Sequence, residues 1–379
     1  METPFYHTKV QCPICESENA FDTVRVGAYI ESGRDSDFRP QGISWRFNKL
    51  QGYDPLVYFI ATCPTCFYSR ESNDSFKNWK TDNTFKMYRL KRVKQLHTDE
   101  LNRTGSIIQR LGESIDIERS PNESAIAKLL LAIYDERLNE RPSNLDLGRL
   151  YLRIAWIFRL FAEADGSPTE SNGTASGVGD LDRSFRAWSE GYHAWIDQRD
   201  SLFQTIDVNG SAKLCENELE EIRAHEESLR TIMNTLAGKL NEVSSDSNSS
   251  GRPFGGRSNV YDFLKDVREN WNATPISEQQ AMEFSIEAYQ KALEGGKEVA
   301  SGSQQVQVLY LIGELLRRIG QFDKAREYFN GALKTGQEFI RRYQSDTSRI
   351  ALAKRVLELA MEQSQLAKDQ SRGKVVSTS

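Results

Sequence analysis

The chain has 379 residues, of which 38% are hydrophobic and 27% are charged, and its formal net charge is -5. A chain of this length folds into two or three packed units, and this composition is typical of a predominantly helical globular protein. The negative charge excludes strong non-specific attraction of the whole molecule to nucleic acid or anionic lipid, so any such binding must be local.

The amino terminus, METPFYHTKVQC, has charged and polar residues where a secretory signal needs an unbroken apolar core. The longest apolar runs, such as 129–134 and 154–158, are far shorter than the roughly 20 residues that span a bilayer. The sequence therefore predicts a cytoplasmic protein without membrane insertion. In a reducing compartment, its cysteines indicate metal binding or redox chemistry before structural disulfides.

Four cysteines form two matched pairs with two-residue spacers, Cys12 with Cys15 and Cys63 with Cys66. Two such turns complete a tetrahedral four-sulfur site, which is closed to catalysis because no coordination position stays open. The flanking segments 23–30 and 56–62 are rich in residues that favour strands. We therefore predict a zinc-ribbon-like β unit over residues 1–75 that binds Zn²⁺ in a structural role.

Two other chemistries fit the same cysteines. Iron can occupy the same four-sulfur geometry, and the sequence does not separate the two metals. A thiol–disulfide couple would use a pair at a helix amino terminus, where the thiol pKa falls, but neither pair opens an amphipathic helix. Glu16 and Phe67 follow the pairs at a position where many such turns place glycine in a left-handed conformation. The fifth cysteine, Cys215, is predicted to be a small buried residue of a later helix.

The segment between the two pairs is longer than in small zinc ribbons and must hold an inserted hairpin or loop. Residues 31–54 are rich in Gly, Asp, Ser and Pro, which indicates loop. Asp35 and Asp37 in this stretch could bind a second cation or act as catalytic carboxylates. We favour the simpler interpretation, in which they cap turns or form salt bridges with the neighbouring arginines Arg34, Arg39 and Arg46.

Three motifs in this region, CPIC (12–15), SDF (36–38) and DPLVYFIATCPTCFYS (54–69), resemble the uncharacterised bacterial family known as domain of unknown function 2225. The resemblance is close over residues 10–70 and looser over AWIFR (155–159) and 276–340. It implies a bacterial protein with a metal-binding head, in which the four paired cysteines are the ligands, and a helical body. It implies no activity.

The stretch from 76 to 94 carries many Lys and Arg residues against the single acid Asp82, with Phe76, Trp79, Phe85 and Tyr88 interleaved. Single-stranded nucleic acid binds surfaces of this composition. We favour a first helix whose aromatic side chains pack on the ribbon while its lysines stay solvated. The candidate binding patch comprises Lys77, Trp79, Lys80, Lys86, Arg89, Lys91, Arg92 and Lys94.

From about residue 122 the hydrophobic pattern takes the helical period, and segments 123–138 and 145–164 are predicted to form a helical hairpin. The region 76–242 is therefore predicted to be helical, with a flexible insertion at 163–180. A Ser/Gly-rich linker at 243–259 precedes a second helical region at 260–370, and residues 371–379 are predicted to be a disordered tail.

The helical pair from Val308 to Leu333 matches the tetratricopeptide pattern, in which small residues let two antiparallel helices approach closely. The preceding helix resembles the second half of another repeat, with Ser285, Tyr289 and Ala292 at the matching places, and segment 347–369 would close the stack. An earlier segment, with Tyr151, Ile154, Ala155 and Phe158, partly fits a first helix. The residues assigned to repeat packing are Leu309, Ile312, Gly313, Leu316, Gly320, Ala325, Phe329 and Ala332.

Together these patterns predict an α+β protein, predominantly α, in which a small zinc-ribbon-like unit precedes a tetratricopeptide-like helical solenoid; an ordinary helical bundle is the alternative. The sequence contains no nucleophile–base arrangement, phosphate-binding glycine loop or open metal motif. We therefore expect a non-catalytic scaffold or adaptor that binds a protein or peptide. A nucleic-acid-binding regulator using the ribbon and residues 76–94 is the first alternative, and a thiol-redox protein or unrecognised enzyme is the second.

Overall fold

The computed structural model describes residues 3–72, 76–166, 259–296 and 298–372. Residues 1–162 and 253–379 form one compact unit, which includes both the predicted head and the C-terminal helices. The other unit, residues 163–252, lies outside the described residues except for its first few. The predicted insertion at 163–180, linker at 243–259 and tail at 371–379 fall almost wholly outside them too, as do Cys215 and the helices predicted between 181 and 242.

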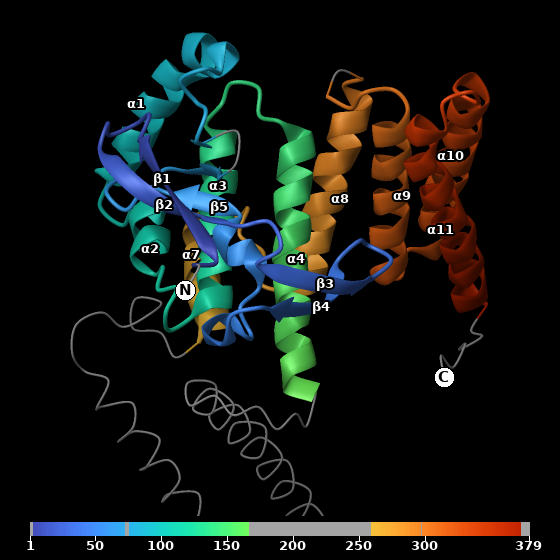
Figure 1. The fold of residues 1–379 in the computed structure, drawn as a ribbon, viewed down its shortest axis with the longest axis horizontal. Coiled ribbons are helices and arrows are strands. Elements are labelled where there is room, and N and C mark those ends of the chain that lie inside the picture. Colours follow the sequence, from blue (N-terminus) through green and yellow to red (C-terminus); the bar gives the residue numbers. More distant parts are fainter. Residues whose placement is uncertain (1–2, 73–75, 167–258, 297, 373–379) are drawn as a thin grey trace, which may run out of the picture. The chain divides into compact units, whose positions relative to one another are not determined.

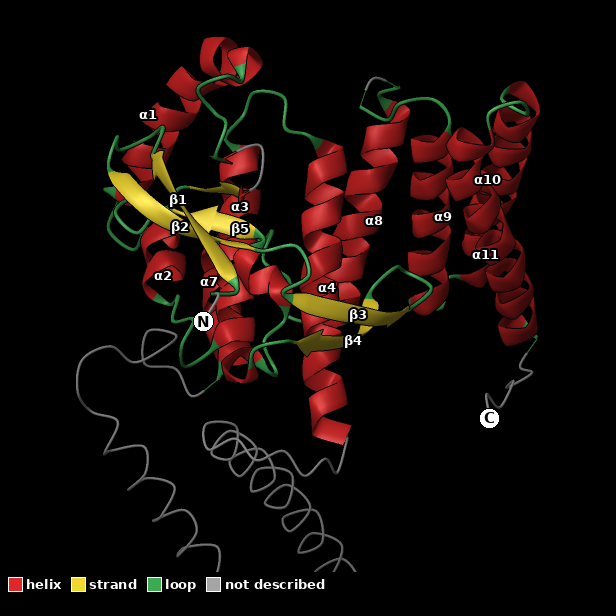
Figure 2. Cartoon of the chain, in the orientation of Figure 1, coloured by secondary structure: helices red, strands yellow, loops and turns green. Residues whose placement is uncertain are grey.

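Three two-stranded antiparallel hairpins come first and helices follow, which confirms the predicted α+β, predominantly helical class for the described part of the chain (Figure 2). The ladder of the first hairpin is complete from the Phe5–Val24 pair to the Gln11–Glu18 pair. The hairpins pair β1 (Phe5–Gln11) with β2 (Glu18–Val24), β3 (Tyr29–Arg34) with β4 (Pro40–Trp45), and β5 (Ile60–Thr62) with β6 (Ser69–Glu71).

The segment between the cysteine pairs differs from the sequence prediction. The strand expected at 23–30 is interrupted, because the chain turns at Gly27, which has a φ of 77°. The stretch 31–54, expected to be loop, instead forms most of the β3–β4 hairpin. Its glycines serve strand pairing: a Cβ on Gly42 would lie 2.3 Å from the Oγ of Ser32, the residue opposite.

The helix α3 (Pro121–Arg137) joins the hairpins to the helices. It follows a π-helical turn (Phe85–Arg89), α1 (Leu90–Leu101) and α2 (Ile107–Glu113). It contacts β5, β6 and the 3₁₀ turn Pro55–Tyr58 as well as α2, and it is buried continuously from Ser124 to Ile133. A helix surrounded in this way is apolar on most sides rather than along one stripe.

The other helices include α4, α8 and α9, which lie side by side in Figure 1, and α10 and α11, which follow α9. Their bounds are α4 (Asn144–Gly166), α7 (Val260–Asn270), α8 (Glu278–Glu294), α9 (Ser303–Arg318), α10 (Phe322–Arg342) and α11 (Thr347–Ser371).

Two helix pairs make the same contact. Between α9 and α10, a Cβ on Gly313 would lie 2.8 Å from the ring of Phe329; between α4 and α8, a Cβ on Gly148 would lie 2.6 Å from the ring of Tyr289. Ser285, one turn before Tyr289, donates a hydrogen bond from its Oγ to the Gly148 carbonyl (2.8 Å). The close approach of α4 to α8 is therefore made at Gly148. Gly148 lies two turns before Ala155, one of the residues that partly fit the repeat pattern in the sequence.

The residues assigned to repeat packing lie at this contact or beside it. Most are buried, Leu309 is partly buried, and Gly320 lies in the turn between α9 and α10 with a φ of 79°. The buried members are Ile312, Gly313, Leu316, Ala325, Phe329 and Ala332. α11 contacts both α10 and α9.

Candidate metal centre

The four paired cysteines lie in the turns of two hairpins, Cys12 and Cys15 between β1 and β2, and Cys63 and Cys66 between β5 and β6. The two turns share one backbone fold. In each, the N–H of the first cysteine donates to the carbonyl five residues later (2.8 and 2.9 Å), and the N–H four residues later donates back to that cysteine's carbonyl (3.0 and 2.8 Å). Neither pair begins a helix, so the setting of a thiol–disulfide couple is not found here.

The residues after the pairs, Glu16 and Phe67, both have a φ of 63°, which is the left-handed conformation that the turn requires. A non-glycine residue loses about 1–2 kcal/mol in this conformation, so side-chain contacts must offset that cost. Glu16 forms an ion pair with Lys94 (2.7 Å). The Phe67 ring lies against Gly112 of α2, where a Cβ would be only 2.1 Å from the ring.

The two turns bring all four sulfurs within 4.8 Å of one another. Two of the separations, Cys12 to Cys66 and Cys15 to Cys63, are 3.6 Å and connect the two turns. A tetrahedral ion with metal–sulfur bonds of about 2.3 Å places its sulfurs about 3.8 Å apart. The cluster could therefore hold one metal ion.

N–H donors near these sulfurs favour their thiolate forms, whereas the proximity of the four sulfurs opposes the loss of all four protons. The Ile14 N–H donates to the Cys12 sulfur (3.4 Å) and the Asn19 side chain to the Cys63 sulfur (3.7 Å). The hydrogen bond with Cys63, together with burial, raises the pKa of Cys12 to about 12, while the bonds that Cys63 accepts from Cys12 and Cys66 lower its pKa. Four adjacent thiolates repel one another, so a cation is needed before all four lose their protons.

A buried pair that the sequence analysis missed, His97 of α1 and Asp135 of α3, fixes the second turn. The His97 Nε2 donates to the carbonyl of Cys66 (2.8 Å), its Nδ1 lies 2.6 Å from an Asp135 oxygen, and the other Asp135 oxygen accepts from the Ser69 N–H (2.7 Å). Burial lowers the pKa of His97, but the Asp135 carboxylate outweighs burial and raises it overall. Both ring nitrogens face oxygens, as a doubly protonated imidazole requires.

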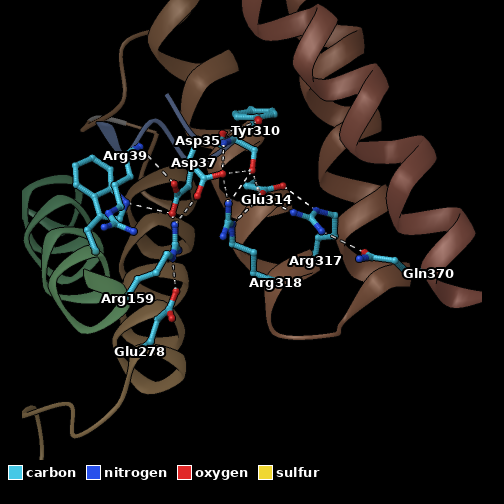
Figure 3. Close-up of polar contacts among 12 residues, drawn as sticks. Asp35, Asp37, Arg39, Arg159, Glu278, Tyr310, Glu314, Arg317, Arg318 and Gln370 are labelled. Carbon is cyan, nitrogen blue, oxygen red and sulfur yellow. Dashed lines mark hydrogen bonds and ion pairs between the residues drawn. The ribbon is translucent and has the colours of Figure 1, made fainter. Parts of the chain in front are cut away.

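A second polar cluster surrounds the β3–β4 turn (Figure 3). Asp37, which is fully buried, accepts from the guanidinium of Arg159 (2.8 Å) and from the indole N–H of Trp156 (3.1 Å), both on α4. Asp35 accepts from Arg159 (2.9 Å) and from Arg318 of α9 (2.8 Å). We refer to Asp35, Asp37, Arg159 and Arg318 as the clamp.

Further residues of α8 and α9 contact the clamp and the β3–β4 turn. Glu278, the first residue of α8, accepts from the Arg159 Nε (2.7 Å), and the buried Glu314 accepts from Arg318 (2.7 Å). The hydroxyl of Tyr310 donates to the Ser36 carbonyl (2.7 Å). Burial raises the pKa of Asp35, but Arg318 and Arg159 outweigh it and hold the pKa below its usual value.

The clamp decides between the interpretations of the acidic pair. Both carboxylates are salt-bridged, as favoured from the sequence, to arginines of α4 and α9. Of the neighbouring arginines, Arg34 pairs with Glu31 (3.1 Å), and the backbone N–H of Arg39 donates to Asp37 (3.3 Å). Both carboxylates thus already have cationic partners within the fold. The signal that could have found Arg159 is the AWIFR motif, which ends on it.

The basic stretch uses most of its aromatic side chains in packing. Phe76 and Phe85 are buried, and the Trp79 indole donates to the Gln11 carbonyl (2.7 Å), which leaves Tyr88, 76% exposed, for stacking. Of the patch cations, Arg89 pairs with Glu136, Lys94 pairs with Glu16 and Arg92 donates to the Leu138 carbonyl, while Lys77, Lys80, Lys86 and Lys91 are exposed. This arrangement gives little stacking surface for nucleic acid.

Two matched cysteine turns and the clamp define a protein with a candidate metal-binding head joined to a helical body. The chain belongs to the family described as uncharacterized protein conserved in bacteria (DUF2225), whose sequence pattern matches residues 5–175 and 258–358. The matched ranges include the four cysteines and the whole clamp. No curated protein and no solved structure matches the chain. Among the described residues, no helix combines the length and apolar character needed to cross a membrane.

Proposed function

We propose that this protein is a non-catalytic scaffold, in which one structural Zn²⁺ on Cys12, Cys15, Cys63 and Cys66 holds the head and the helical body binds a protein or peptide partner. The observation that carries the metal assignment is the convergence of two identical turns on one four-sulfur cluster. Four thiolates fill a tetrahedral coordination sphere, so the ion has no open position for a substrate.

Zinc is preferred over iron because a four-thiolate site built from two such turns matches structural zinc sites without requiring a redox role. The surroundings support a structural role as well. Cys12, Cys63 and Cys66 are buried, and the His97–Asp135 pair and the Phe67–Gly112 contact fix the second turn to helices. Metal binding would then contribute directly to the folding free energy.

For the helical body we propose a tetratricopeptide-like solenoid with an interrupted first repeat. The pairs α4–α8 and α9–α10 share the glycine-to-aromatic contact, and α11 would be the closing helix. Stacked repeats of this kind expose extended surfaces that bind peptides. Tyr310, Glu314 and Arg318 follow one another by one turn along α9 and hold the β3–β4 turn. The partner surface must therefore lie away from this face of α9.

Metal analysis of the purified protein tests the proposal. We expect about one zinc per chain by elemental mass spectrometry. A Cys63→Ser/Cys66→Ser variant should lose the metal and the ordered head, whereas Cys215→Ser should keep both. A metal-free wild type with a folded head would contradict the metal site, and iron with visible absorption would contradict the zinc assignment alone.

The scaffold role is tested by chemical cross-linking in bacterial cells followed by mass spectrometry. We expect a defined partner that cross-links to the helices of the wild-type protein and is lost, or greatly reduced, in the metal-free variant. Nucleic acid recovered in place of protein, with binding that falls steeply as salt rises, would favour the alternative function.

A further inference from the structure

A cavity with a volume of about 590 Å³ lies beside the clamp. Its walls come from the β2–β3 turn, the β3–β4 hairpin, the 3₁₀ turn Pro55–Tyr58 and α4. Small-molecule sites have volumes of roughly 300–1,000 Å³ and apolar walls with a few polar groups. Tyr29, Tyr58, Phe59 and Trp156 give this cavity such walls.

Arg153 of α4 lines this cavity without a negatively charged partner. Its guanidinium stacks 4.0 Å above the ring of Phe59 and donates one hydrogen bond, to the carbonyl of Arg149 (3.1 Å). Among the described residues no carboxylate lies within ion-pair distance of it. Burial accordingly lowers the pKa of Arg153.

Arg159, about two turns further along α4, differs from Arg153 because carboxylates neutralise its charge. Arg159 meets three carboxylates within 2.9 Å. A guanidinium has five N–H donors, and a partly buried one that uses a single donor is an incomplete site unless an anion binds it. Stacking on Phe59 leaves the edge of the Arg153 guanidinium, where these donors lie, available to a ligand.

The cavity wall contains four other charged side chains, two arginines and two acids. Arg25 donates to the Phe5 carbonyl and stacks on Tyr6, and Arg39 is buried. The acids are Glu31 and Asp54, and burial raises the pKa of Asp54. With three arginines against two acids in the wall, the net charge favours an anion.

We propose that this cavity binds a small organic anion, a carboxylate or a phosphate ester, whose charged group pairs with Arg153 and whose aromatic or apolar body lies against Tyr29 and Trp156. Bidentate pairing of a guanidinium with either group has the same geometry, so the two sources share one recognition chemistry. Trp156 also donates to Asp37, so the clamp holds one wall of the site in place. The proposal goes beyond the scaffold function and is independent of the metal's identity.

Isothermal titration of the metal-loaded, full-length protein with benzoate, phenyl phosphate and benzyl alcohol tests the proposal. At least one of the two anions should bind, the tighter one identifying the headgroup, and the neutral alcohol should bind at least tenfold more weakly because it cannot form charge-assisted bonds. Arg153→Met should weaken the anion about tenfold or more. Arg149→Met, one turn earlier on the same helix and outside this cavity, is the matched control and should bind like the wild type.

A stability measurement separates ligand binding from a structural role of Arg153. Removing a guanidinium that has no charged partner should leave the ligand-free melting temperature of Arg153→Met unchanged or higher, whereas loss of a structural arginine would lower it. Arg153→Gln, which keeps a polar side chain, repeats both measurements if the Met variant does not fold. The proposal is overturned if neither anion binds at about 10 mM, if the variants bind as tightly as the wild type, or if the alcohol binds equally well.

Discussion

Replacing Asp37 with Asn removes the negative charge at the centre of the clamp while keeping the shape of the side chain. Asp37 is fully buried and the Arg159 side chain is only 10% exposed, so solvent screens their interaction weakly. Removing one partner of a buried ion pair typically costs 3–5 kcal/mol, because the other charge stays buried without compensation. Arg159 would keep Asp35 and Glu278, so we expect the lower end, about 3 kcal/mol.

Urea unfolding of the metal-loaded protein, followed by tryptophan fluorescence, measures this loss of unfolding free energy; Trp156 lies in the clamp itself. For a unit of this size, about 3 kcal/mol corresponds to a melting temperature lower by roughly 5–10 °C. Asp146→Asn is the control, because Asp146 forms an exposed pair with Arg149, with side chains 53% and 46% exposed, and should change stability by less than about 1 kcal/mol. If Asp37→Asn were no more destabilising than this control, the buried ion pairs of the clamp would not contribute the stability expected of them.

Gly112→Ala tests the packing of the head, and Gly331→Ala in α10 is its control. Gly112→Ala places a Cβ 2.1 Å from the Phe67 ring, so we expect a loss of about 1–3 kcal/mol and faster metal loss to a chelator. Gly331→Ala, whose nearest neighbouring atom would be 3.8 Å away, should be neutral or stabilising by up to about 1 kcal/mol; equal effects of the two would refute the Phe67 contact. Burial lowers the pKa of Lys128 to about 8 from an ordinary 10.5, so the unfolded chain binds more protons between these values and stability should rise with pH there, by about 3 kcal/mol in total. In urea titrations from pH 7.5 to 10.5, Lys128→Met should lack this rise, and parallel wild-type and variant profiles would contradict it.

The four paired cysteines were the most predictable part of the candidate site, because two-residue spacers are local and each pair folds into its own turn. Their four sulfurs lie within 4.8 Å of one another, so the cysteines predicted to act together could hold one metal ion. His97 and Asp135 left no comparable trace. They lie 38 positions apart and reach the Cys66 turn only because α1 and α3 pack against it, so their role depends on tertiary structure.

The clamp shows a different limit of sequence reasoning. Asp35 and Asp37 indicated salt bridges, but the chain offers arginines both next to them and far away, and proximity in sequence favoured Arg34, Arg39 and Arg46. The partners that the fold supplies lie 122 positions away for Arg159 and 283 for Arg318. The family resemblance had marked the SDF and AWIFR motifs separately. Only the structure shows that one contacts the other.

The contact between α4 and α8 joins two segments that lie far apart in the sequence. A sequence search for helical repeats expects the two helices of a repeat next to each other, yet Gly148 of α4 and Ser285 of α8, which are hydrogen-bonded, lie 137 positions apart. Bringing together two residues so far apart in the chain costs conformational entropy, although that cost grows only slowly with the number of residues between them. The Arg159–Glu278 pair joins α4 to the first residue of α8. Because Arg159 of α4 pairs with Asp37 and with Glu278, it connects the segment between the cysteine pairs to both α4 and α8.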